Sequence, residues 1–283
     1  MPFDQPKRLA ATLAGLAIGA AAAPALAQDS LLPLVGASRH SEGAETYVFQ
    51  CLLGGVDGRG GFVGYEEAAP RMQASAPIRW VDLAGVEGTG TSNPPVPMDI
   101  PCEYAYVSDA GPAPAGIGGY VGVPGDWNPL PAALALHSPQ SQTYSAAALD
   151  YFASIAHPTT QATLTQVIRT DLEGDGVDEV LITVKDDSDG WPTTIHPGDH
   201  SAILLRRLRG GTVETVVVDG EFYDAYYEFA APTEFEVLAV ADLNGDGVAE
   251  IFARADYYEG SSFTVYQLVG GQPVLALSCG CGS

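Results

Sequence analysis

The sequence has few basic residues, and lysine is almost absent from it. Its 283 residues include 12 Lys and Arg against 35 Asp and Glu, which gives a formal net charge of −23 at pH 7. The only lysines are Lys7 and Lys185. A charge of this sign repels the phosphates of nucleic acids and the anionic surfaces of membranes, and it attracts cations. Nucleic-acid binding is therefore excluded.

Long apolar runs are lacking after residue 27, so no membrane insertion is expected there. The start of the chain differs. Lys7 and Arg8 precede an apolar run over 9–23, and the small residues Ala25 to Ala27 follow it, an order that is typical of a secretion signal. We expect residues 1–27 to be a signal peptide that is cleaved near Ala27, and the remaining chain to be exported to the periplasm or the extracellular medium.

Motifs of enzymes are also missing. No Gly-x-Ser-x-Gly sequence is present, and the glycine clusters at 54–61 and 116–122 match no dinucleotide-binding fingerprint and precede no helical pattern. Acidic pairs occur throughout so acidic a chain, so no pair stands out as a glycosidase site. Nothing in the sequence supports a catalytic residue, and a non-enzymatic role is favoured.

Only four cysteines are present. In an exported chain an even number of cysteines favours disulfides. Cys51 and Cys102 lie in strand-like stretches of the first half, and we expect them to pair. Cys279 and Cys281 are then expected to form a staple at the end of the chain, although all three connectivities remain open. The alternative is that Cys279 and Cys281 form a redox element, but no Cys-x-x-Cys motif at a helix start supports it.

What the sequence does contain is one acidic pattern in two copies, 171–179 and 242–250. Each copy has oxygen-bearing side chains at its first, third, fifth and ninth places and glycine at its sixth. This spacing suits Ca²⁺, which takes about six to eight oxygen ligands from a tightly turned loop. At the seventh place the backbone carbonyl can serve as a ligand. The predicted calcium ligands are Asp171, Glu173, Asp175, Val177 and Glu179 in the first copy, and Asp242, Asn244, Asp246, Val248 and Glu250 in the second.

The two copies resemble the calcium loops of VCBS and FG-GAP (integrin-α-like) repeats, which read Asp-x-Asp/Asn-Gly-Asp-Gly-x-x-Asp/Glu between two strands. An EF-hand is a poor match, because Ile182 and Ala253 stand where its twelfth-place glutamate is required. Glu173 departs from the pattern, and the flanking FG and GAP sequences are missing. The resemblance covers roughly the last 120 residues and implies Ca²⁺ as the cofactor. The alternative is a pair of Asp/Asn/Gly turns without metal, but the presence of two copies favours the metal.

Around each acidic copy the hydrophobic pattern predicts a four-stranded unit. One strand enters the loop, a second leaves it, a third reaches a Gly-Gly hairpin turn, and a fourth returns. The two units span about 160–220 and 233–278, within a region of 137–283. Such units are blade-like, but a closed propeller needs about four to eight of them. Other elements must therefore cover the edges of the two units.

The rest of the chain is expected to supply that cover. Residues 28–136 show short β-like runs between Gly- and Pro-rich turns, which predicts an N-terminal β-rich domain. A connecting helix is predicted from Ser138 to His157, with an apolar face that packs against the first unit. That face comprises Tyr144, Ala148, Phe152 and Ile155. The predicted fold class is thus mainly β, with antiparallel sheets, two blade-like repeats and one connecting helix.

Two further features could carry chemistry. An insertion in the first unit, 185–200, contains His196, Asp199 and His200, which could hold zinc or act as acid and base, but Pro and Gly between them favour a solvated loop. Tyrosines beside carboxylates in 221–229 and 256–260 could stack on a sugar or form the half-buried ends of strands.

The predicted function is that of an exported calcium-binding β-repeat protein with a structural or ligand-binding role, toward an unidentified protein or glycan partner. The alternative is a secreted hydrolase or carbohydrate-binding protein that uses the 185–200 insertion and the tyrosine-rich clusters.

Overall fold

The computed structural model describes residues 31–42, 45–186, 194–228 and 233–282. About 55% of the chain is strand and 8% is helix. Every strand pairing in the described ranges is antiparallel. The predicted mainly β fold with antiparallel sheets is therefore confirmed. The predicted signal peptide, 1–27, lies outside the described residues.

The first part of the chain forms a six-stranded sheet with the order β3-β2-β1-β8-β4-β5. Its strands are β1 (Leu32–Glu42), β2 (Glu45–Val56), β3 (Phe62–Gly64), β4 (Ala76–Asp82), β5 (Gly85–Ser92) and β8 (Gly118–Pro124). One face carries apolar residues that pack with two short helices, α1 (Tyr65–Ala68) and η1 (Ala69–Arg71). A two-stranded ribbon of β6 (Val96–Pro97) and β7 (Tyr106–Val107) lies beside this sheet.

The second part forms two further sheets. A five-stranded sheet has the order β14-β13-β11-β10-β9, and a four-stranded sheet has the order β16-β17-β18-β19. The strands of the first are β9 (Leu134–Leu136), β10 (Thr163–Thr170), β11 (Glu179–Lys185), β13 (His200–Arg209) and β14 (Thr212–Phe222). Those of the second are β16 (Glu234–Ala241), β17 (Glu250–Tyr257), β18 (Gly260–Val269) and β19 (Gln272–Gly282). A small ribbon pairs β12 (Thr194–Ile195) with β15 (Tyr227–Glu228).

Each of these two sheets contains a hairpin that turns on two glycines. Gly210 and Gly211 join β13 to β14, and Gly270 and Gly271 join β18 to β19. All four have positive φ, between 58° and 82°. A two-residue turn with positive φ at both positions matches the twist of the flanking strands, and glycine adopts it without steric penalty. The Gly-Gly signal in the sequence therefore located both hairpins.

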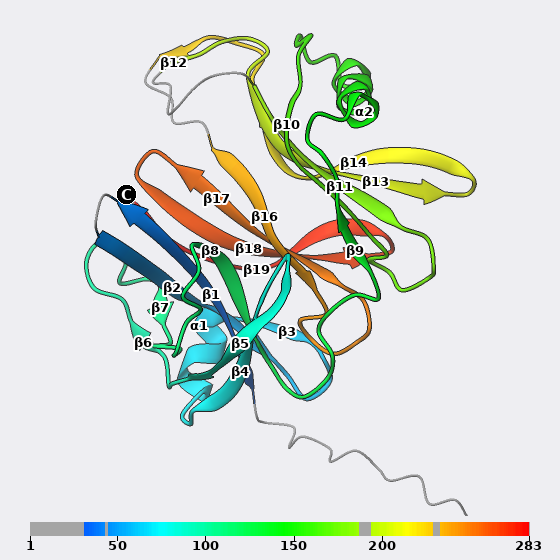
Figure 1. Ribbon diagram of the computed structural model, residues 1–283. Helices are drawn as coiled ribbons and strands as arrows, with labels where there is room; N and C mark the ends of the chain where they lie inside the picture. Colours follow the sequence, from blue (N-terminus) through cyan, green and yellow to red (C-terminus); the bar gives the residue numbers. More distant parts are fainter. Residues whose placement is uncertain (1–30, 43–44, 187–193, 229–232, 283) are drawn as a thin grey trace, which may run out of the picture.

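The three sheets are stacked, and the last one in the sequence lies in the middle (Figure 1). The strand β17 shows why. Its consecutive residues Ile251, Phe252 and Ala253 are all buried, although successive side chains of a strand point to opposite faces. Phe252 packs toward the six-stranded sheet, whereas Ile251 and Ala253 pack toward the five-stranded sheet. A sheet that is apolar on both faces must be covered on both.

The helix α2 (Gln142–Ser154) covers the outer face of the five-stranded sheet. Ala148 and Phe152 are fully buried against that sheet, which confirms the predicted packing face. The predicted start at Ser138 is wrong, because Ser138 forms a turn in which its Oγ accepts the N–H of Gln140 (3.2 Å), and Ser141 is the N-cap. Ile155 lies beyond the end of the helix and is exposed rather than packed.

The disulfides differ from the expected pairing. Cys51 bonds to Cys279, and Cys102 bonds to Cys281, with Cα–Cα distances of 6.1 and 5.5 Å. Cys279 and Cys281 are two residues apart on β19, so their side chains point to one face, about 6.6 Å apart along the strand. Parallel side chains at that spacing cannot bond to each other. Each instead reaches a cysteine of the first half of the chain, and a redox pair of Cys279 and Cys281 is ruled out.

Candidate metal loops

The two acidic copies connect neighbouring strands of the five-stranded and the four-stranded sheet, which we call the repeat sheets because each contains one acidic copy. The first acidic loop (171–179) leads from β10 into β11, and the second acidic loop (242–250) leads from β16 into β17. Glu179 is the first residue of β11, and Glu250 is the first residue of β17. The ten predicted ligands thus lie in two loops, five in each, and each loop joins two antiparallel neighbours.

Both loops are closed by nearly the same hydrogen bonds. The carboxylate of the first residue accepts backbone N–H groups, including that of the glycine at the sixth place, from Gly176 to Asp171 (2.7 Å) and from Gly247 to Asp242 (3.0 Å). In addition, Asp171 accepts the N–H of Asp175, and Asp242 accepts that of Gly245. Both sixth-place glycines have φ of 88°, a conformation that side chains with a Cβ rarely adopt.

The later ligands of the two loops also correspond. The fifth-place carboxylate accepts the N–H of the seventh residue, from Val177 to Asp175 and from Val248 to Asp246, each at 2.8 Å. The ninth-place glutamate reaches back across the loop. The N–H of Leu172 donates to Oε2 of Glu179 (2.9 Å), and that of Leu243 donates to Oε2 of Glu250 (2.8 Å). The two copies therefore fold as the same local structure.

The two closing glutamates are buried, unlike most carboxylates of this chain. Glu179 is 3% exposed and Glu250 is 2% exposed. Burial raises the pKa of both groups, that of Glu250 to about 8, although the N–H of Leu243 partly opposes the shift and the charges of Asp246 and Asp242 add to it. No ion pair of the described residues includes either glutamate. A cation at the loop would favour their ionised form.

The donor set of each loop fits a hard cation, because it consists of carboxylate, amide and carbonyl oxygens. A carboxylate oxygen that accepts one N–H keeps a second lone pair for a metal. The positions of the acidic side chains match a metal site less fully than their chemistry does. Within the described part of the chain, no three His, Cys, Asp or Glu side chains gather in a group that could hold a metal ion. The structure thus brings the ten predicted ligands into two loops without making their acidic groups converge.

The two loops lie against each other. The N–H of Ala249 in the second loop donates to the carbonyl oxygen of Leu172 in the first (2.8 Å). A Cβ on Gly174 would lie 3.4 Å from the carbonyl oxygen of Gly247. Since Leu172 also donates to Glu179, two hydrogen bonds connect the closing glutamate of one loop to the residue that precedes Glu250 in the other.

The second loop also contacts the first half of the chain. Nδ2 of Asn244 donates to the carbonyl oxygen of Gly60 (3.0 Å), and Nε1 of Trp127 donates to that of Asp242 (2.9 Å). The N–H of Asp242 donates to Pro129 (2.8 Å). The sequence analysis assigned Trp127 and Pro129 no role. The tryptophan itself was the available signal, because so large an apolar ring is rarely left in solvent.

The other candidates do not form one site. His196 is exposed and packs edge-on against Tyr226, whereas His200 is buried against Phe152, with ring centroids 4.5 Å apart. Burial lowers the pKa of His200. The hydroxyl of Tyr223 donates to Glu221 within its own strand region. Tyr226, Tyr227 and Tyr258 are exposed. Residues 187–193 of the predicted insertion lie outside the described residues.

Comparisons with known proteins add no family. No family model matches the chain, and no curated protein and no solved structure matches it. Among the described residues, no helix is both long and apolar enough to span a membrane. The fold therefore defines a class, a disulfide-bonded protein of stacked antiparallel sheets, and the function has to be argued from the loops themselves.

Proposed function

We propose that this is an exported calcium-binding protein of the VCBS or FG-GAP type, in which Ca²⁺ at two blade-like repeats stabilises the junction of three β-sheets. The observation that carries the proposal is the shared hydrogen-bonding of the two acidic loops. Seventy-one residues apart in sequence, they position the same side chains at the same places. In both loops the ninth-place glutamate is buried and lies in no ion pair of the described residues, and a bound cation would compensate its charge.

The residues that would hold Ca²⁺ are those of the predicted set. In the second loop, Asp242, Asn244 and Asp246 would provide side-chain oxygens, Val248 its carbonyl oxygen and Glu250 its buried carboxylate. The first loop would use the corresponding residues, with Glu173 in place of Asn244. When bound, the ion would neutralise carboxylates that otherwise repel one another, so the folded state would gain a stability that grows with the logarithm of the calcium concentration above the Kd.

The location of the loops supports a structural role for the ion. The second loop contacts the first loop through Ala249 and the N-terminal half through Asn244 and Asp242. A cation that fixes the second loop therefore also fixes the contacts of the central sheet with both of its neighbours. The two disulfides, which persist in oxidising compartments, support export, where calcium is abundant.

The test is thermal unfolding of the purified protein in EDTA and in millimolar CaCl₂, together with metal analysis of the untreated protein. We expect bound calcium, and a melting temperature that rises in CaCl₂. The double variant Asp175→Ala with Asp246→Ala should lose this increment. Glu87→Gln, which removes an exposed carboxylate of β5, is the matched control and should retain it.

MgCl₂ should have a smaller effect than CaCl₂, because Mg²⁺ requires a more regular shell and releases its water reluctantly. A wild-type protein without bound calcium and with the same melting temperature in EDTA and CaCl₂ would contradict the proposal.

A further inference from the structure

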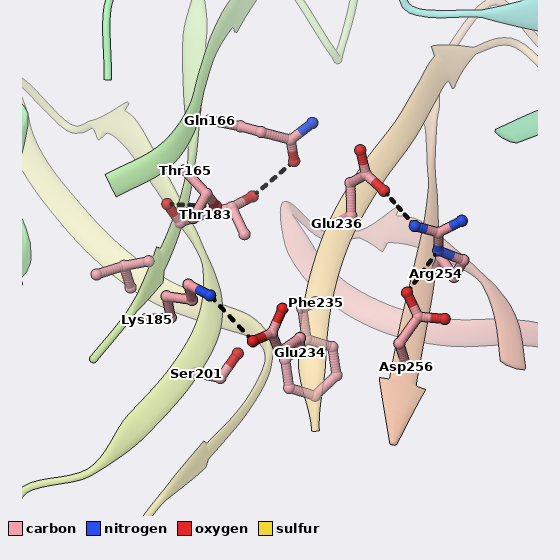
Figure 2. A pocket seen from close by; sticks show the side chains of 11 residues that line it. Thr165, Gln166, Thr183, Lys185, Ser201, Glu234, Phe235, Glu236, Arg254 and Asp256 are labelled. Atoms are coloured by element: carbon pink, nitrogen blue, oxygen red, sulfur yellow. Dashed lines mark hydrogen bonds and ion pairs between the residues drawn. The ribbon is translucent and has the colours of Figure 1, made fainter. Parts of the chain in front are cut away.

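A cleft lies between the two repeat sheets, at the opposite end of their strands from the acidic loops. It is formed by the beginnings of β10 and β16, the ends of β11 and β17, and the first residues of β13 (Figure 2). Its volume is about 210 Å³. Because β10 and β16 each run from this cleft to an acidic loop, the cleft is separate from the proposed calcium sites.

One lining residue of the cleft, Gln166, joins the two sheets. Nε2 of Gln166 donates to the carbonyl oxygen of Val237 (2.9 Å), and Oε1 of Gln166 accepts the N–H of Val237 (2.8 Å). The hydroxyl of Thr183 donates to the same Oε1 (3.1 Å). The Gln166 amide thus pairs with the backbone of β16 at Val237 and connects the two sheets beside the cleft.

The walls carry charges of both signs. Nζ of Lys185, on the five-stranded sheet, lies 3.0 Å from Oε1 of Glu234, on the four-stranded sheet. Arg254 lies between two carboxylates, with Nη2 2.8 Å from Glu236 and Nε 2.8 Å from Asp256. Figure 2 shows these side chains around the open space between the sheets. Donors and acceptors therefore alternate along the wall.

Stability does not explain this arrangement. Glu234 and Asp256 are directly opposite each other in the pairing of β16 with β17, and like charges in that position are unfavourable. Partly exposed ion pairs such as those of Lys185 and Arg254 contribute little to stability. Polar groups that are held in place by partners yet remain accessible are typical of a ligand site.

The chemistry of the wall selects the class of ligand. Three carboxylates repel phosphates and other anions, and the polar lining does not suit an apolar ligand. Hydroxyl groups, which both donate and accept, match the ammonium, guanidinium and carboxylate groups of the wall and the hydroxyl of Ser201. Phe235 adds one apolar surface. The volume lies below the range of drug-sized ligands, about 300–1,000 Å³, and suits one small ring. We propose that this cleft binds a neutral polyhydroxylated ligand of monosaccharide size.

The test uses the full chain in CaCl₂ and titrates neutral hexoses and pentoses by ligand-observed NMR and calorimetry. Glucuronate and glucosamine serve as the anionic and cationic counterparts. We expect at least one neutral sugar to bind and glucuronate not to bind. Arg254→Gln and, separately, Lys185→Gln should weaken binding by about tenfold or more, since each removes a charged donor from the wall.

Arg169→Gln is the matched control. Arg169 also places Nε 2.8 Å from an aspartate, Asp178, but it does so at the loop end of β10. This variant should bind the sugar like the wild type. Absence of binding by every neutral sugar, binding by glucosamine alone, or equal losses in all three variants would overturn the proposal. Circular dichroism of each variant shows whether a loss of sugar binding is due to unfolding. The two cleft variants test the contribution of the cleft to binding independently of each other.

Discussion

Glutamine in place of Glu250 is a direct test of the second acidic loop, because it keeps the shape of the side chain and removes its charge. In the metal-free protein, burial raises the pKa of Glu250 from 4.5 to about 8. The folded state therefore binds a proton more tightly than the unfolded state. Ionising Glu250 therefore lowers the free energy of unfolding. This penalty is absent below pH 4.5, grows as the pH rises, and is complete above pH 8.

The size of the effect follows from these values. At pH 7 the penalty amounts to about 3 kcal/mol, since each pKa unit corresponds to about 1.4 kcal/mol. The glutamine oxygen can still accept the N–H of Leu243, but the amide NH₂ would face the backbone N–H of residue 250. These two donors cannot bond to each other, and their contact destabilises the variant by about 1–2 kcal/mol. We expect Glu250→Gln to stabilise the metal-free protein by about 1–2 kcal/mol, or about 2–8 °C.

Calcium should reverse the order of the two proteins. Saturation at 100 times the Kd stabilises a protein by about 2.7 kcal/mol per site, and the wild type should gain this at the second loop while Glu250→Gln should not. The assay is thermal unfolding of both proteins at pH 5 and pH 7, in EDTA and in CaCl₂. At pH 5 the advantage of the variant in EDTA should disappear, because the penalty of about 1 kcal/mol then no longer exceeds the cost of the amide.

The matched control is again Glu87→Gln, since Glu87 is exposed on β5. It should follow the wild type within about 0.5 kcal/mol under all four conditions. A Glu250→Gln protein that is less stable than the wild type in EDTA at pH 7, or that shows the full calcium increment, would refute the reasoning about the buried charge.

Three further predictions concern the scaffold. Cys51→Ala with Cys279→Ala should lower stability by about 4 kcal/mol in thermal unfolding without reductant, because the remaining Cys102–Cys281 bond leaves a loop of about 50 residues open; an unchanged melting temperature would argue against the pairing. Trp127→Phe should lower the free energy of unfolding by about 1 kcal/mol, because the hydrogen bond to Asp242 is lost. It should also abolish most of the change in tryptophan fluorescence that calcium causes, and a retained change would show that another tryptophan responds to calcium. Phe152→Ala should cost about 3–5 kcal/mol in urea unfolding, whereas the exposed Ile155→Ala should change stability by less than about 0.5 kcal/mol.

Local signals in the sequence were reliable where turn chemistry is specific. The strands around the acidic loops and the Gly-Gly hairpins were located from alternating apolar residues bounded by glycine, because these patterns act over a few residues. The strand β1 carries no such pattern over residues 36–42, which are small or polar. It forms a strand through its pairing with its neighbour β2 and with the distant β8, and a distant partner leaves no periodic pattern in the strand itself.

The sequence alone determined the β-rich class and the positions of the two acidic loops, because composition and short motifs are properties of the chain. Only the tertiary structure decided that the last sheet is the central one, that the two loops touch, and which cysteines pair. These outcomes depend on which apolar faces cover one another. The two buried faces of β17 required a sheet on each side, and the geometry of β19 directed Cys279 and Cys281 to separate partners.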